Sequence, residues 1–283
     1  MKKLATIAIP TYNREKYIKQ SIDSVLDQTY KNFELLILDN CSTDNTGKIV
    51  KNISDIRIRY LKNERNIGMI NNWNKCVELA EGDYLIILGD DDKLYPEFLE
   101  HSLTAHQDNP KIGFSFTHCN KVDPDGKYLM RWGYQFTPSG CLTDYKYLYY
   151  TINYGCCLTN SSTVFINKKV FKKVGLFETP YGANTFDLNM WIKIAEEYDV
   201  YFIDKVLVDY RIHENQVSEI HWRRKEKCTG KIGTYLEIFG VIAFLMNRPC
   251  YHKSKGKREF LLNKLLKYDR ELSVLLKDAI PEL

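Results

Sequence analysis

Three adjacent carboxylates, Asp90, Asp91 and Asp92, are the residues of this sequence whose types and spacing most clearly suggest chemistry. They directly follow residues 84–88, a short apolar run typical of a buried strand. Neighbouring carboxylates repel one another unless a positive partner is present, and their hard oxygen atoms suit Mg²⁺ or Mn²⁺. Two carboxylates and a bound diphosphate would complete such a metal site. A solvated acidic turn or a helix N-terminal cluster is the structural alternative.

Two further polar groups follow predicted strands in the same way. Tyr12 comes after Pro10, which ends an apolar run, and its ring could stack on a nucleoside base. Asp39 follows residues 33–38 and could accept a hydrogen bond from a ring N–H such as that of uracil. Asp39 could instead cap the next turn together with Ser42 and Asp44.

The elements that must position these groups alternate over the first ninety residues. Apolar runs predict strands over 4–9, 33–38, 56–61 and 84–88, and helical spacing predicts helices over 17–26, 44–50 and 70–80. This alternation favours a mostly parallel sheet with helices on both faces. Ligands of such sheets bind at the carboxyl ends of the strands. We therefore expect the three polar clusters to meet at one edge.

The rest of the chain has a looser pattern. Strands are expected over 113–119, 163–166 and 201–212, and helices over 144–152, 187–198, 235–246 and 260–276. Its many aromatic rings could be core or could contact an acceptor sugar. The apolar run 235–246 is too short to span a bilayer. With the basic stretches 222–231 and 252–258, it could form either a buried core helix or a surface that docks on a membrane.

Composition is that of a soluble globular protein. Of 283 residues, 44% are hydrophobic and 27% charged, and the net charge is +4. The eight cysteines include no C-x-x-C pair, which argues against a zinc site and a disulfide framework. The apolar run after the basic N-terminus is too short for a signal peptide, so we expect a cytoplasmic protein.

Four segments in series, 9–14, 38–44, 66–68 and 80–84, resemble the family 2 glycosyltransferases in order and spacing, and the resemblance extends over roughly residues 4–218. It implies an α/β fold of the GT-A type, which is a Rossmann-like, mostly parallel central sheet flanked by helices. Residues 1–95 would form the nucleotide-sugar-binding half, 96–218 the acceptor-binding half, and 219–283 a helical C-terminal extension. The resemblance also implies a Mn²⁺ or Mg²⁺ cofactor and inversion at the anomeric carbon.

On the donor side, the resemblance places the nucleoside base at Tyr12 and Asp39, the ribose at Asp90 and the metal at Asp91, with Asp92 as a second candidate ligand. The remaining motif positions expected at the donor nucleotide are Pro10, Asn13, Arg14 and Asn66. Gly89 departs from the family pattern, which has an acid at this position, and Trp73 stands where many relatives carry arginine.

On the acceptor side, Asp187 falls where the family has the base that deprotonates the attacking hydroxyl. Phe186 replaces the usual preceding glutamate, and its apolar ring would raise the pKa of Asp187 by desolvation. Helix N-capping is the structural alternative for Asp187. In the late motif, Arg211 is expected to neutralise phosphate, while His213 is expected either to ligate the metal or to be a structural histidine.

The function expected from these residues is inverting transfer of a sugar from a nucleotide diphosphate sugar, expected to be a UDP-sugar, to a hydroxyl group. By family analogy the acceptor is a cell-surface or lipid-linked glycan, such as a lipopolysaccharide or capsule unit, made at the inner face of the membrane. The basic C-terminal region could give peripheral membrane contact, and no nucleic-acid partner is expected. The alternatives are a non-catalytic nucleotide- or sugar-binding subunit and a nucleotidyltransferase, although the Gly-rich, Lys-bearing loop of the latter is missing near the first strand.

Overall fold

The computed structural model describes residues 4–107, 109–132, 139–142, 147, 160–178, 186–214, 216 and 259. Contacts divide the chain into two compact units, Met1–Glu178 with Met190–Ile212, and Thr179–Asn189 with His213–Leu283. Apart from single residues, the predicted helix 144–152 and the predicted helical extension 219–283 lie outside the described residues.

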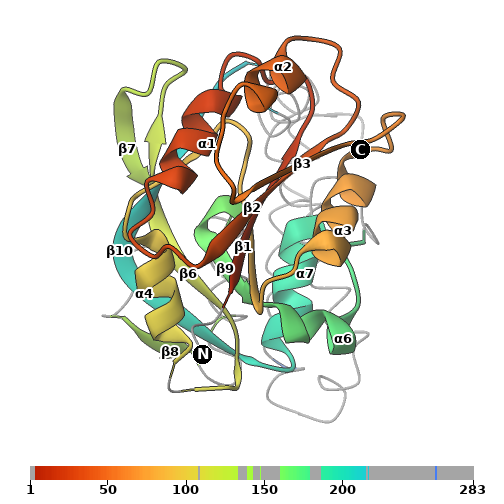
Figure 1. The fold of residues 1–283 in the computed structure, drawn as a ribbon. Coiled ribbons are helices and arrows are strands. Elements are labelled where there is room, and N and C mark those ends of the chain that lie inside the picture. The colour runs from red at the N-terminus through yellow and green to blue at the C-terminus, as the bar shows by residue number, and fades with distance from the viewer. Residues whose placement is uncertain are drawn as a thin grey trace, which may run out of the picture. The chain divides into compact units, whose positions relative to one another are not determined.

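The alternation predicted for the first ninety residues is confirmed (Figure 1). The elements are β1 (Ala5–Thr11), α1 (Ile18–Leu26), β2 (Phe33–Asp39), α2 (Thr46–Lys51), β3 (Ile58–Lys62), α3 (Met69–Leu79) and β4 (Tyr84–Ile87). Strand β1 pairs in parallel with β2 and β4, and β2 pairs in parallel with β3. The carboxyl ends of these strands therefore lie along one edge.

The second half of the chain extends this sheet and makes it mixed. Its elements are β5 (Lys93–Leu94), α4 (Phe98–Ala105), β6 (Ile112–Val122), β7 (Tyr128–Trp132), β8 (Gly140–Leu142), the 3₁₀ turns η2 (Ser161–Thr163) and η3 (Lys168–Val170), β9 (Val164–Asn167), α6 (Phe171–Val174), α7 (Phe186–Ala195) and β10 (Asp199–Arg211). The strand order is β3-β2-β1-β4-β9-β6-β10-β5. Parallel pairing holds from β3 to β4 and between β6 and β10, but β9 runs antiparallel to both β4 and β6. The expected central α/β sheet is present. The strands of the first half pair in parallel, as predicted, whereas β9 adds antiparallel pairs that the sequence did not indicate.

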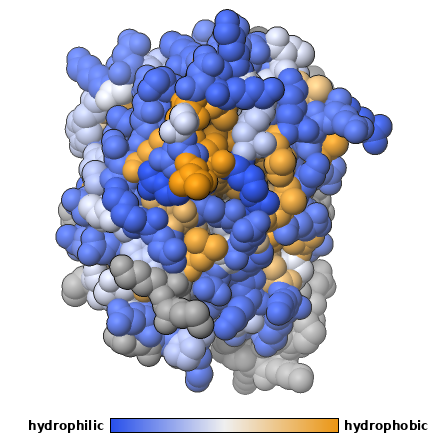
Figure 2. Space-filling model, viewed as in Figure 1, coloured by the Kyte–Doolittle hydropathy of each residue, from blue (hydrophilic) through white to orange (hydrophobic). Residues whose placement is uncertain are grey.

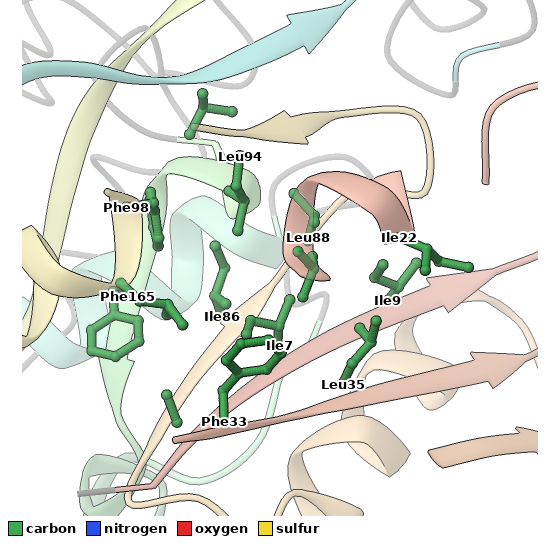
Figure 3. Packing of buried hydrophobic residues seen from close by; sticks show 14 of the residues in the cluster. Ile7, Ile9, Ile22, Phe33, Leu35, Ile86, Leu88, Leu94, Phe98 and Phe165 are labelled. Carbon is green, nitrogen blue, oxygen red and sulfur yellow. The ribbon is translucent and has the colours of Figure 1, made fainter. Parts of the chain in front are cut away.

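Alternate residues of the parallel strands bury one face of the sheet against α1 and α4. Figure 3 shows Ile7, Leu35 and Ile86 packed with Ile22 of α1 and Phe98 of α4. Helix α3 packs on β1, β2 and β4 from the opposite face (Figure 1). Fully burying such a side chain contributes roughly 1.5–3 kcal/mol, so this core fixes the register of the strands that end at the polar edge.

Most of the face that Figure 2 shows is hydrophilic, with hydrophobic residues gathered near its centre. Among the residues that the structure describes, no helix is both long and apolar enough to cross a membrane.

Candidate active site

The acidic turn 90–92 lies just beyond the carboxyl end of β4, as predicted, and its three carboxylates have different surroundings. Asp92 is buried, with 2% of its surface exposed. Its Oδ1 accepts a hydrogen bond from Arg211 N (2.9 Å), and its Oδ2 accepts one from the Ser162 hydroxyl (2.5 Å). Burial and the neighbouring charge of Asp91 raise the pKa of Asp92 above its usual range. Both oxygens of Asp92 are thus turned toward the protein.

Asp90 faces the loop that follows β1. Its Oδ2 accepts a hydrogen bond from Tyr12 N (3.3 Å), and its Oδ1 lies 3.1 Å from Arg14 Nε. The same Arg14 nitrogen is 3.9 Å from Asp91 Oδ2. Burial and the charge of Asp91 raise the pKa of Asp90 to about 7, with Arg14 opposing the shift. The structure therefore brings Tyr12, Arg14, Asp90 and Asp91 together, as the sequence predicted.

Asp39 lies at the end of β2 and is fully buried. Its Oδ1 accepts a hydrogen bond from Ser42 N, and its Oδ2 accepts one from the Tyr60 hydroxyl, each at 2.7 Å. Burial, followed by the hydrogen bond and charge of Asp39, raises the pKa of Tyr60, which keeps the phenol a neutral donor. Asp39 caps the turn at Ser42, which was the structural alternative, and it does so at the edge expected to receive the base.

The loops after β1 and β2 are joined by Asn13. Asn13 N donates to Ser42 Oγ (2.9 Å), and Asn13 Oδ1 accepts from Thr43 N (2.8 Å). Asn13 has a left-handed φ of 53°, a conformation that asparagine tolerates better than most residues. Pro10, in β1, is paired with Leu38 of β2. Tyr12 is 43% exposed and so offers its ring for stacking.

Asn66 is exposed and lies at the end of a network of amide side chains beside this edge, whose members Asn40 and Asn63 are buried. Its Oδ1 accepts from Asn40 Nδ2 and from Gly68 N, both at 2.9 Å. Asn40 Oδ1 in turn accepts from Asn63 Nδ2 (3.1 Å). An open pocket of about 510 Å³ adjoins the network and is lined by Arg65, Asn66, Ile67 and Asn71. Asn66 therefore both braces the loop after β2 and lines a pocket.

Arg211, at the end of β10, directs its guanidinium into the protein. It is 1% exposed, and Nε donates to the Asp91 carbonyl oxygen (2.9 Å). The remaining nitrogens donate to the carbonyl oxygens of Asp123 and Pro124 and to the Gln20 side chain. In this structure Arg211 holds the backbone of the acidic turn, whereas the sequence predicted a direct phosphate contact.

Two residues of the site, Gly89 and Ser162, were not predicted as functional. Ser162 Oγ accepts a hydrogen bond from Gly89 N (2.9 Å) while it donates to Asp92. A Cβ atom at Gly89 would lie 2.7 Å from Asp92 Oδ2 and 3.1 Å from Asp91 Oδ1. The buried position of Asp92 therefore explains why glycine replaces the family's acid here. Gly89 was visible as a departure in sequence, but Ser162 carried no local signal.

A second departure, Trp73, has a packing role. Its ring meets Phe177 edge-on, with centroids 5.5 Å apart. The neighbouring Asn74 donates to the Phe177 carbonyl oxygen and accepts from Phe177 N, both at 2.9 Å. Helix α3 is thereby fixed to the 175–177 segment.

Asp187 and His213 belong to the second unit. Asp187 lies in the first turn of α7, half-buried, and its Oδ1 accepts from Leu188 N (2.7 Å). Phe186 before it is buried, and so is His213. The approach of Asp187 and His213 to the carboxylates of the first unit stays a prediction.

The donor set of the acidic turn fits a hard divalent cation. Within the described ranges, no three His, Cys, Asp or Glu side chains are grouped as a metal cluster. Mg²⁺ and Mn²⁺ sites at phosphates, however, commonly use one or two carboxylates and complete their shell with substrate and water. Asp91 supplies one such carboxylate, and Asp90 lies beside it. Burial and then the charge of Asp91 raise the pKa of Asp90, and a cation bound at Asp91 would oppose the second of these causes.

Comparisons with known proteins agree with this geometry. The sequence profile of Glycosyl transferase family 2 matches residues 6–175. TuaG of Bacillus subtilis, a glycosyltransferase assigned to teichuronic acid biosynthesis, is 31% identical over 229 residues, which cover 80% of this chain and 86% of TuaG. The structure of Staphylococcus aureus TarS 1–349 with UDP-GlcNAc matches with a TM-score of 0.68 and 19% identity, over 93% of this chain and 72% of that one. A mannosyltransferase of Pyrobaculum calidifontis in complex with GDP-Man and Mn²⁺ matches with a TM-score of 0.57 and 15% identity, over 99% of this chain and 88% of that one.

Proposed function

The chain belongs to glycosyl transferase family 2, and we propose that it transfers a sugar, with inversion, from a nucleotide diphosphate donor to a hydroxyl of a cell-surface glycan or its lipid-linked precursor. The observation that carries the proposal is that the loops after β1, β2 and β4 are hydrogen-bonded to one another. Tyr12 N reaches Asp90, and Asn13 reaches Ser42 and Thr43. A stacking ring, a buried carboxylate and an acidic turn thus meet where an α/β sheet binds its ligand.

The assignment of UDP as the nucleotide rests on two supports. The Asp39 carboxylate lies at the end of β2, where we place the edge of a uracil ring; each of its oxygens already accepts one hydrogen bond and has a second lone pair for a ring N–H. The TarS structure of the same fold contains UDP-GlcNAc. The acceptor class is supported by TuaG, which is assigned to teichuronic acid biosynthesis.

The residues of this chain divide the work as follows. Tyr12 stacks on the base, Asp39 and its turn read the edge of the base, and Asp90 binds the ribose. Asp91, with His213 as a second ligand, would hold a divalent cation that offsets the charge building on the leaving diphosphate. We assign Asp92 and Arg211 to holding the turn, since both are buried and turned inward.

Asp187 is the proposed general base. As the acceptor oxygen bonds to the anomeric carbon, Asp187 takes the hydroxyl proton, and the bond between that carbon and the phosphate oxygen breaks with its electron pair going to the nucleoside diphosphate. Attack from the face opposite the leaving group gives a single displacement and therefore inversion.

The test is a thermal-shift panel with UDP, GDP, dTDP and CDP, each with and without Mn²⁺, because a ligand that binds the native state raises its melting temperature. We expect a Mn²⁺-dependent shift with UDP that disappears in Asp91→Ala. The control is Asp125→Ala, which removes an exposed aspartate from the β6–β7 turn. If the wild-type protein shifts with none of the nucleotides, the donor site is wrong; if GDP alone shifts it, the assignment of UDP is wrong.

A further inference from the structure

We propose that Ser162 is a positioning residue for the donor site, because its hydroxyl fixes the turn that presents Asp91 to the metal-bound diphosphate. The inference rests on the proposed function, since it assumes that Asp91 receives the cation. Ser162 belongs to none of the motifs expected to bind the donor or the metal, and it was not named as a site residue from the sequence. Its hydrogen bonds go to Gly89 and Asp92, and none goes to Asp91, so it acts on Asp91 through these neighbours.

Ser162 is hydrogen-bonded to the residue before Asp90 and to the residue after Asp91. Its hydroxyl accepts from Gly89 N (2.9 Å) and donates to Asp92 Oδ2 (2.5 Å), and the side chain is 1% exposed. One oxygen atom therefore ties together the residues on both sides of Asp90 and Asp91. A buried hydroxyl with a donor and an acceptor in place is costly to remove, because both partners are left without a hydrogen bond.

The pairing of β4 with β9 places Ser162 next to Gly89, although the two residues are far apart in the sequence. Strand β9 pairs antiparallel with β4, and Leu85 lies opposite Ile166. Four residues beyond Leu85 is Gly89, and four before Ile166 is Ser162, so the register brings the two together. Asn160 holds the local turn with a capping box, in which its side chain accepts from Thr163 N while Thr163 Oγ1 accepts from Asn160 N.

The opposite side of the turn is already held by other groups. Arg211 donates through N to Asp92 Oδ1 and through Nε to the Asp91 carbonyl oxygen. The Ser21 hydroxyl donates to the Asp92 carbonyl oxygen (2.7 Å). Without Ser162, Asp92 would keep these contacts but lose the partner of Oδ2, and Gly89 N would lose its acceptor. The expected result is a folded protein whose Asp91 carboxylate is less well oriented.

The test measures Mn²⁺ affinity directly. Free Mn²⁺ is followed by electron paramagnetic resonance as it is titrated into protein saturated with UDP, and UDP binding without metal is measured by calorimetry. Loss of a direct outer partner of a metal ligand typically weakens metal binding about 10–100-fold. Ser162 reaches Asp91 only through Gly89 and Asp92, so we expect Ser162→Ala to weaken Mn²⁺ binding by about 10-fold, at the lower end of that range. Metal-free UDP binding should stay within about twofold of wild type, because the base and ribose contacts lie on other side chains.

The matched control is Ser102→Ala, on α4. Ser102 is also fully buried, and among the described residues its hydroxyl has no hydrogen-bond partner. It should bind Mn²⁺ and UDP like wild type. Ser162→Cys is the second variant: its sulfur atom is larger than the hydroxyl oxygen, so the site stays filled, but it makes weaker hydrogen bonds. It should lose Mn²⁺ affinity in the same direction as Ser162→Ala, and it serves as the test if Ser162→Ala does not fold.

The outcomes separate this inference from the proposed function. If wild type and Ser162 variants bind Mn²⁺ equally in the presence of UDP, the positioning role is refuted while the donor site stands. Equal losses of metal-dependent and metal-free UDP binding would indicate general damage to the fold and would also refute it. If wild type itself binds no Mn²⁺ with UDP, the donor site fails and this inference fails with it.

Discussion

Replacing Gly89 by the acid that the family has at this position should lower the stability of this protein and weaken its binding of UDP. A Cβ atom there would lie 2.7 Å from Asp92 Oδ2, against about 3.4 Å for an ordinary contact, so the carboxylate would have to retreat by about 0.7 Å. It has little freedom to do so, because Ser162 holds Oδ2 and Arg211 N holds Oδ1. Overpacking of a well-fitted site costs about 1–3 kcal/mol. For a domain of this size, a cost of 2 kcal/mol lowers the melting temperature by roughly 4–8 °C.

The assay compares melting temperature and Mn²⁺-dependent UDP binding for Gly89→Ala and Gly89→Asp. Both variants should melt lower and bind the nucleotide more weakly, even though Gly89→Asp recreates the family pattern. In an Asp92→Ala background the carboxylate that Cβ meets is absent, so adding Gly89→Ala should cost less than it does in wild type. Coupling between contacting residues is typically 0.5–3 kcal/mol. Additive costs, or stronger UDP binding by Gly89→Asp, would refute the steric argument.

Three further substitutions test other parts of the structure. Asp187→Asn should lower the transfer rate by about 10²–10⁴-fold with UDP binding intact, as expected for loss of a general base, and a near wild-type rate in a sugar-transfer assay would contradict that role. Asn74→Ala removes both hydrogen bonds to the Phe177 backbone and should lower the free energy of unfolding, measured by urea titration, by about 1–3 kcal/mol. The control is Asn71→Ala, an exposed position on the same helix, which should change the free energy of unfolding by less than about 0.5 kcal/mol. Burial lowers the pKa of His118 from 6.5, so the unfolded chain takes up a proton at this residue before the folded protein does, and stability falls as the pH drops below about 6.5. The melting temperature of His118→Gln should therefore fall less than that of wild type between about pH 7 and 5.5. Equal losses would argue against this linkage.

The sequence was informative where a signal is local. A polar residue directly after an apolar run marks the carboxyl end of a strand, and parallel pairing then brought the loops at Tyr12, Asp39 and Asp90 together without further information. Ser162 could not be found this way, because its place depends on β9 entering antiparallel between β4 and β6. The direction of the Arg211 side chain was hidden for the same reason: its acceptors come from distant segments that only the folded chain assembles.

The departures of this chain from the family pattern are coordinated with their surroundings, which bears on the non-catalytic alternative. A site that has lost its function is free to accumulate unrelated changes, and nothing would keep its polar groups matched. Here Gly89 leaves room for the Asp92 side chain and donates its N–H to Ser162. Trp73 packs on Phe177, whose backbone N–H and carbonyl oxygen are both hydrogen-bonded to the Asn74 side chain. The loops that carry the predicted donor contacts are also braced to one another before any ligand binds. Because such preorganisation lowers the entropy cost of binding, the structure favours a donor site that is kept ready for use.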